Sequence, residues 1–254
     1  MQTVDKAFEL LGFFSEQRPQ AGLSELAQES GFDKATVHRL LLALLRHGVV
    51  EQDPGNKRYR IGPGVLRLAR LREATSPLAS IGAPLLRALA EHTGETAHLT
   101  VLAGSRLSTI AVEESRHSNR VKMDLGEALP LHATASGMVV LAFADDLLFE
   151  CLRSRARQGY TGNTVTRAAE LERLAAKTRS DGYATAEGWF ETDVCSIAAP
   201  YFDQFGCVRG SIAVAAPSTR FSPQQQASIR SAVARAAADM TTRSGGAAPA
   251  GMAA

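Results

Sequence analysis

Four side chains able to hydrogen-bond to base edges or phosphates, Lys34, Thr36, His38 and Arg39, fall within the short stretch 34–39. If this stretch is helical, they share one face, and apolar residues at helical spacing form the other: Val37, Leu40, Leu41, Leu44 and Leu45. The DNA major groove admits a helix with an apolar back and a donor-rich front near its N-terminus. The pattern therefore predicts a DNA-reading helix, and the alternative is a surface helical hairpin with solvated charges.

A second polar group contains the side-chain types of a nucleophilic hydrolase: His132, Thr134 and Ser136, with Asp193 and Cys195 farther along the chain. No G-x-S-x-G motif accompanies them, and triads are recognised by geometry rather than by sequence. We predict that His132 is a structural histidine near the start of a helix. The free amides at that helix start offer an anion site, and capping by Thr134 is the alternative.

Motifs for metals and cofactors are missing from the sequence. None of the six histidines shows H-x-x-x-H spacing, and the three cysteines, Cys151, Cys195 and Cys207, form no C-x-x-C pair. Neither glycine-rich phosphate signature, G-x-x-x-x-G-K-[ST] or G-x-G-x-x-G, occurs. We predict no metal, no cofactor and no catalysis. Unpaired thiols, and the lack of any apolar run approaching about 18 residues, favour a cytoplasmic protein without a membrane span.

The elements that would position the DNA-reading residues lie on both sides of them. We predict a helix over 3–17 with Thr3 as its N-cap, a helix capped by Ser24, a turn at Gly31 and the reading helix capped by Asp33. Gly48 ends that helix, and strands over 49–52 and 57–61 flank a turn at 53–56. Three helices and a β-hairpin form a winged helix-turn-helix, whose hairpin cations Lys57, Arg58 and Arg60 would reach phosphates or the minor groove.

The charge distribution supports this interpretation better than the net charge of +2 does. Residues 34–72 contain nine lysines and arginines against two acidic residues, whereas residues 1–33 contain two against six. Positive charge concentrated beside a groove-sized helix is the expected footprint of phosphate binding.

The rest of the chain predicts a linker and a second domain. An apolar-faced helix over 65–73 suggests pairing with a second copy, and 74–77 marks a boundary. Beyond it we expect helices over 78–93, 131–142, 145–153, 167–180 and 222–240, and strands over 97–102, 107–113, 120–124, 196–203 and 210–217. These predict an α+β fold, with domains at 1–63, 64–77 (linker helix) and 78–243, and a disordered tail at 244–254.

The order of elements and several local motifs resemble the isocitrate lyase regulator (IclR) family of bacterial transcription factors. The motifs are Leu23-Ser-Glu-Leu-Ala, Thr36-Val-His-Arg-Leu-Leu, Tyr59-Arg-Ile-Gly, Leu131-His-Ala-Thr-Ala-Ser-Gly, Gly182-Tyr-Ala, Ile197-Ala-Ala-Pro-Tyr-Phe-Asp and Gly210-Ser-Ile-Ala-Val. The resemblance implies an N-terminal winged helix, a dimerising linker helix, a GAF-like effector domain, and dimers that often pair into tetramers. Such a dimer would bind a pseudo-palindromic double-stranded DNA operator under the control of a small organic acid.

The resemblance also assigns residues to the two sites. Ser24 and Ala35 join Lys34, Thr36, His38 and Arg39 at the DNA. The effector pocket would be lined by small residues of the second domain: Ala135, Ser136, Ala186, Val194, Ser196, Ala213 and Ala215.

Three departures from the family pattern concern this pocket. Met138 replaces a usual lysine, Ala213 and Ala215 replace serines found in some relatives, and the stretch 189–193 is bulkier than usual. Together they predict a wider, more apolar pocket and a larger, aromatic effector. Two other functions remain open on the sequence: an enzyme with a winged-helix appendage, and a DNA-binding protein whose second domain only mediates assembly.

Overall fold

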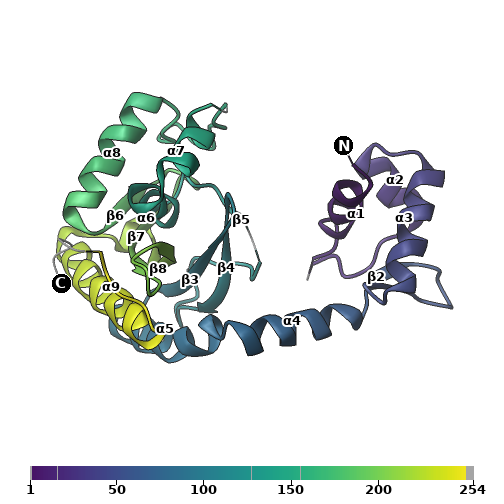
Figure 1. Cartoon of the computed structure of the whole chain (residues 1–254), viewed down its shortest axis with the longest axis horizontal. Coiled ribbons are helices and arrows are strands. Elements are labelled where there is room, and N and C mark those ends of the chain that lie inside the picture. Colours follow the sequence, from purple (N-terminus) through teal and green to yellow (C-terminus); the bar gives the residue numbers. More distant parts are fainter. Residues whose placement is uncertain (1, 16, 127, 155, 250–254) are drawn as a thin grey trace. The chain divides into compact units, whose positions relative to one another are not determined.

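The computed structural model describes residues 2–15, 17–126, 128–154 and 156–249. The chain divides into two compact units, residues 1–77 and residues 78–254 (Figure 1). Each unit has its own hydrophobic core, so each is described by itself. None of the described helices is long and apolar enough to cross a membrane.

The first unit is a winged helix-turn-helix followed by a helix. Its elements are α1 (Thr3–Leu11), α2 (Leu23–Ser30), α3 (Lys34–Arg46), β1 (Val50–Gln52), β2 (Tyr59–Ile61) and α4 (Gly64–Thr75). Leu10, Leu26, Val37 and Leu41 are fully buried and bring the first three helices together around one core. The antiparallel pair β1–β2 forms the hairpin, and Tyr59 joins it to Ala21 by two backbone hydrogen bonds.

The predicted first helix is too long at its C-terminal end. The helix ends at Leu11, where the amides of Phe13 and Phe14 turn back to the carbonyls of Leu10 and Leu11. Ser15 and Arg18 then exchange backbone hydrogen bonds and close a loop. The apolar periodicity continues through this loop because Phe13 and Phe14 still pack against the core. The N-cap is Gln2 rather than Thr3.

The second unit is α+β. It comprises α5 (Leu78–Thr93), β3 (Thr96–Ala103), β4 (Arg106–Glu113), β5 (Ala128–Leu129), α6 (Ala135–Phe143), α7 (Asp146–Arg153), α8 (Ala168–Asp181), β6 (Ala184–Glu187), β7 (Val194–Phe202), β8 (Val208–Pro217), a 3₁₀ turn (Ser218–Arg220) and α9 (Pro223–Arg243). The strands form one antiparallel sheet in the order β5-β4-β3-β8-β7-β6.

The two faces of this sheet meet different helices. Ala97, Leu99 and Val101 of β3 belong to the core that α5 and α9 cover. Because side chains alternate along a strand, His98 and Thr100 lie on the opposite face, where α6 packs (Figure 1). The α6 face holds mostly small residues from the central strands, among them Ala198, Ala213 and Ser211.

Two other predictions need comment. The strand expected over 120–124 is absent: this segment is irregular, and the Thr96 hydroxyl binds the Val121 carbonyl at 2.7 Å in place of a strand partner. Of the tail predicted to be disordered, residues 250–254 lie outside the described residues. At its start, Gly246 and Ala247 donate backbone hydrogen bonds to the carbonyls of Thr241 and Asp203.

Candidate DNA-binding face and ligand pocket

The cap of α3 determines where its outward face begins. Asp33 Oδ1 accepts from the backbone N–H of Thr36 at 2.9 Å, as predicted for an N-cap. Hydrogen bonds from Thr36, chiefly its side chain, hold the pKa of Asp33 below its ordinary value. Gly31, at φ +69°, makes the turn from α2 into this cap.

The outward face of α3 carries the residues predicted to read DNA. Lys34, Ala35, His38 and Arg39 are exposed, and Thr36 is half-buried. Arg39 Nη2 donates to Thr36 Oγ1 at 3.2 Å, which holds the guanidinium near the first turn. The face therefore presents two cations and an imidazole next to the positive end of the helix dipole, an arrangement suited to anionic DNA.

Ser24 is exposed, but it is not the N-cap of α2. The N-cap is Gly22, two residues earlier, and the helix begins at Leu23. The Gly22 amide donates to Glu25 Oε2 at 3.2 Å, so Glu25 satisfies the helix start in place of the serine hydroxyl. Ser24 stays available at the first turn of the helix that precedes α3.

The three hairpin cations differ in their partners. Arg58 donates to both carboxylate oxygens of Glu25, at 2.9 and 2.8 Å, and to the Gln20 carbonyl at 3.1 Å. Arg60 pairs with Glu51 at 2.5 Å. Lys57 is exposed at the hairpin turn, at φ +57°, and makes no ion pair with the described residues.

Glu25 is the centre of this charge cluster. Hydrogen bonds from Arg58, from the Gly22 amide and from Arg18 lower its pKa to about 2. A carboxylate shared by two arginines ties the hairpin to the start of α2. Arg58 is thus occupied within the unit, whereas the Lys57 ammonium faces water.

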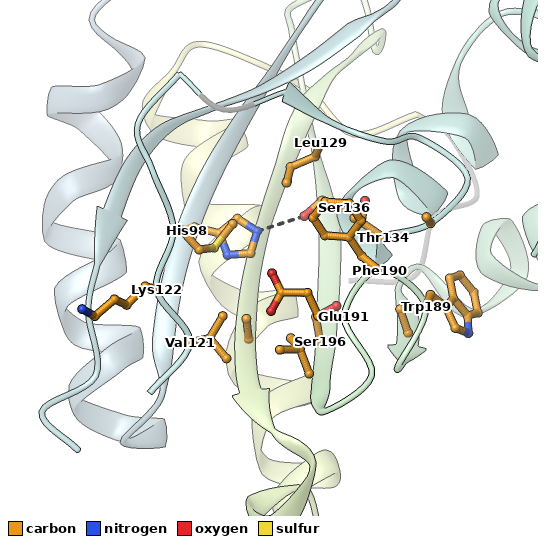
Figure 2. Close-up of a pocket in the computed structure, with 15 residues that line it drawn as sticks. His98, Val121, Lys122, Leu129, Thr134, Ser136, Trp189, Phe190, Glu191 and Ser196 are labelled. Atoms are coloured by element: carbon orange, nitrogen blue, oxygen red, sulfur yellow. Dashed lines mark hydrogen bonds between the residues drawn. The ribbon is translucent and has the colours of Figure 1, made fainter. Parts of the chain in front are cut away.

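The second unit contains a cavity between α6, the sheet and two connecting segments (Figure 2). The cavity itself measures about 60 Å³, and the space around it, with the open solvent at its mouth included, measures about 560 Å³. Its lining is His98, Val121, Lys122, Met123, Leu129, Ala133, Thr134, Ser136, Ala186, Trp189, Phe190, Glu191, Val194, Ser196 and Ala215.

Five of the seven residues assigned to the pocket by resemblance line this cavity: Ser136, Ala186, Val194, Ser196 and Ala215. The other two, Ala135 and Ala213, are fully buried in the core beneath α6 and are not part of the lining. Met138 is likewise buried in that core and is not part of the lining.

The bulky stretch noted in the sequence forms one wall of the cavity. Trp189, Phe190 and Glu191 follow β6 and line the pocket. The hydroxyls of Thr161 and Thr164 donate to the carbonyls of Gly188 and Trp189, at 2.5 and 2.6 Å, and hold this wall in place. The Tyr160 ring meets Phe190 edge to face, with centroids 4.8 Å apart.

The sequence did not single out His98 or the segment 121–123. His98 is 3% exposed, and its Nε2 lies 3.2 Å from Ser136 Oγ. Burial lowers the pKa of His98 to about 4, so the imidazole is neutral at pH 7. Its other ring nitrogen, Nδ1, has no hydrogen-bond partner in the part of the chain that the structure describes. The one sequence feature that could have pointed to His98 is its polar side chain within a strand predicted to be half-buried.

The hydrolase constellation considered in the sequence is not assembled. His132 Nε2 bonds the Gln158 carbonyl at 2.8 Å, while Ser136 pairs with His98. Cys195 packs in the core on the other face of the sheet, and burial raises the pKa of its thiol. Thr134 Oγ1 accepts from the Gly137 amide at 2.9 Å and caps α6. Among the described residues, no three His, Cys, Asp or Glu side chains gather as they would at a metal site.

Comparison with known families matches both units. A model described as "Bacterial transcriptional regulator IclR C-terminal" matches residues 74–242. A second, described as "IclR helix-turn-helix domain", matches residues 3–54. Among curated proteins, the HTH-type transcriptional regulator BhcR of Paracoccus denitrificans is 32% identical over 242 residues, covering 95% of this chain and 86% of that protein.

Solved structures agree with these matches. An IclR transcriptional regulator from Silicibacter sp. TM1040 is 41% identical, with a TM-score of 0.85 and coverage of 98% of both chains. An IclR homologue from Microbacterium hydrocarbonoxydans, solved in complex with 4-hydroxybenzoate, shares the fold at 22% identity. Its TM-score is 0.79, and the match covers 95% of this chain and 98% of that one.

Proposed function

Because the chain belongs to the IclR family of bacterial transcriptional regulators, we propose that it binds an operator through α3 and responds to a small organic acid in its second unit. The observation that carries the proposal is the cavity beneath α6, on a chain whose α3 exposes two cations and a histidine. The effector can change operator binding only to the extent that its own affinity differs between the protein arrangement that binds DNA and the one that does not. We place this activity in the cytoplasm and expect no catalytic turnover.

In the DNA-binding part of the proposal, Lys34, His38 and Arg39 read base edges in the major groove, with Ala35 and Thr36 at the closest approach. Ser24 and Lys57 contact phosphates on either side. Arg58 and Arg60 contribute mainly by holding the hairpin in place, since both are paired with carboxylates of the same unit. Two copies related by a two-fold axis would place two α3 helices in successive grooves of a pseudo-palindrome.

Alanine substitution tests the reading face. Arg39→Ala or Lys34→Ala should each cost about 1–3 kcal/mol in affinity for a duplex selected by the wild-type protein from a random pool. Arg87→Ala is the matched control, because it removes one exposed cation from α5 in the other unit. Unchanged affinity in both α3 variants would refute the assignment of this face.

For the ligand, we propose an acid larger than two or three carbons, with an apolar or aromatic body. Val121, Met123, Leu129 and Trp189 supply apolar walls, and the relative from Microbacterium hydrocarbonoxydans shows that 4-hydroxybenzoate is bound by one protein of this fold. Thermal-shift measurements with aliphatic and aromatic acids test this part. Stabilisation by glyoxylate or pyruvate, with no response to any aromatic acid, would contradict the proposed size.

The same screen tests the assembly-only alternative. A second domain that only mediated oligomerisation would have a filled interior and show no ligand-induced stabilisation. The lined cavity favours ligand binding, and the named relatives are transcriptional regulators. Consumption of a stabilising compound during incubation would instead favour the enzyme alternative.

A further inference from the structure

His98 stands out on the α6 face of the sheet because it is large and polar among small neighbours. It pairs across the sheet with Ala213 of β8, and the adjacent positions of that face hold Ala215 and Ser196. Side chains this small leave space, and the space is the cavity. In Figure 2 the His98 ring projects into the group of lining residues, and the dashed line joins it to Ser136.

Nδ1 of His98 is a buried polar atom without a partner. The residue is 3% exposed, and Nδ1 forms no hydrogen bond with a described group. Leaving a buried nitrogen unsatisfied is unfavourable, so such an atom at a cavity wall points to a ligand group that completes it. The Thr134 hydroxyl already donates its proton to the Pro130 carbonyl and accepts from the Gly137 amide, so it has no proton left to donate to Nδ1.

Two acidic or basic residues other than His98 belong to the lining, Lys122 and Glu191, and both are exposed residues. Figure 2 shows Lys122 extending away from the other labelled side chains, whereas the Glu191 carboxylate points in among them, between His98 and Ser196. At His98 the lining offers neutral hydrogen-bonding groups, Ser136 and Ser196, between apolar walls. A ligand carboxylate placed there would be desolvated without a cationic side chain beside it, because Lys122 points away.

We propose that His98 determines the specificity of this pocket by taking a hydroxyl group of the effector on Nδ1, while Ser136 fixes the ring from Nε2. The inference rests on the proposed function, since it requires an effector in this cavity. It adds the chemical class: an acid with a hydroxyl group at the far end from its carboxylate, the carboxylate remaining at the solvated mouth.

A hydroxyl is the group that suits this nitrogen whichever way Ser136 is oriented. If the Ser136 hydroxyl donates to Nε2, then Nδ1 carries the proton and needs an acceptor; in the other tautomer Nδ1 needs a donor. A hydroxyl group can be either, whereas a carbonyl or a carboxylate oxygen only accepts. The neutral imidazole, which its low pKa maintains, therefore pairs with a hydroxyl without moving a proton.

The test compares acids that differ by one hydroxyl group: 4-hydroxybenzoate with benzoate, 4-hydroxyphenylacetate with phenylacetate, and 6-hydroxyhexanoate with hexanoate. Calorimetry on the full-length protein gives the affinities. For at least one pair we expect the hydroxylated member to bind about tenfold more tightly or better, which is the usual effect of leaving a buried hydrogen-bonding group unpaired. Equal affinities within every pair that binds would overturn the role of His98, although the cavity would still be a site for organic acids. No binding by any of the six would overturn the proposed effector class as well.

Variants connect the preference to His98. His98→Phe keeps the volume but removes Nδ1, so the preference should fall below about twofold through weaker binding of the hydroxylated acid alone. His98→Asn keeps an amide near the Nδ1 position and should retain part of the preference for the hydroxylated acid. This variant also provides the test if His98→Phe fails to fold. If His98→Phe or a folded His98→Leu variant kept the wild-type preference for the hydroxylated acid, a group other than His98 would be selecting the hydroxyl.

Discussion

At the scale of single residues, His98 is a histidine kept neutral by its surroundings. Burial lowers its pKa from 6.5 to about 4, and desolvation is the cause of the shift. In the unfolded chain the same imidazole would titrate near its ordinary value. Between the two pKa values the unfolded state therefore binds more protons than the folded state.

This difference predicts a pH dependence of stability for the second unit. Stability due to neutral His98 is fully present above about pH 6.5 and is lost as the pH falls toward 4. Between about pH 7.5 and pH 5, wild type should lose about 2 kcal/mol more than His98→Gln, which does not titrate. Urea unfolding followed by the fluorescence of Trp189, the single tryptophan, measures both. Equal losses in the two proteins would mean that His98 is protonated in the folded state.

The family resemblance assigned several small side chains of the pocket but did not point to its histidine. Ser136, Ala186 and Ser196 could be assigned because the motifs around them resemble those of a family with a pocket there. His98 could not, because alternation along a strand gives the face of a residue and not what lies opposite. Its position beside a cavity depends on segments that are distant in sequence, 121–123 and 189–194.

At the scale of elements, the start of α6 determines the geometry of the cavity. Thr134 caps the helix through the Gly137 amide, and the preceding segment passes very close to that glycine. A Cβ added at Gly137 would lie 2.3 Å from the Leu131 carbonyl oxygen and 2.4 Å from its Cα. Both are backbone atoms, so neither can move aside without displacing the loop that carries Ala133 and Thr134.

Gly137→Ala should therefore lower the stability of the second unit by about 1–3 kcal/mol or more, as overpacking does, and reduce ligand binding in the cavity. Differential scanning calorimetry with and without a binding acid measures both effects. Gly162→Ala is the matched control, because a Cβ there has no atom within 4 Å. If Gly137→Ala melted and bound like the control, the close approach to Leu131 would not be a constraint.

The β1–β2 hairpin gives a contrast between neighbouring cations. Lys57→Ala should weaken binding to all duplexes roughly threefold and reduce the salt slope by about 1, without changing stability, since it removes one phosphate contact. Arg58→Ala should lower the melting temperature, because it breaks the fork with Glu25, and should bring the pKa of Glu25 back toward 4.5. If Lys57→Ala and Arg58→Ala reduced the salt slope equally and left the melting temperature unchanged, Arg58 would be a phosphate contact rather than a structural residue.

Apolar spacing predicted the bounds of the helix over 78–93 well, but it made the helix over 3–17 too long and predicted a strand over 120–124 that is absent. The helix over 78–93 has the observed bounds because its apolar face is continuous and ends at Thr93 before a glycine. Alternation over 120–124 predicted a strand, but here it reflects Val121 and Met123 turning into the cavity. Side chains alternate in burial wherever the backbone is extended, whether or not a neighbouring strand is hydrogen-bonded to it. The alternating pattern in the sequence therefore indicates an extended segment but not a strand partner.

At the scale of the whole molecule, α4 carries three largely exposed leucines. Leu66, Leu68 and Leu71 are 62%, 51% and 56% exposed, and no residue of this helix is buried. An isolated helix of about a dozen residues is marginal in water, and exposed leucines on one element mark a binding surface. A second copy is the partner we propose, because a two-fold axis pairs a helix with itself and also places two reading helices on one operator.

Leu68→Glu should therefore dissociate the dimer, since it places a carboxylate where two copies of α4 would pack. Sedimentation velocity should show a monomer, and affinity for a two-half-site duplex should fall by about a hundredfold, because each head then binds alone. Affinity for a single half-site should stay unchanged. Leu147→Glu is the control, as it replaces a leucine that is 79% exposed on α7. A variant at Leu68 that still sediments as a dimer would place the interface elsewhere on the chain.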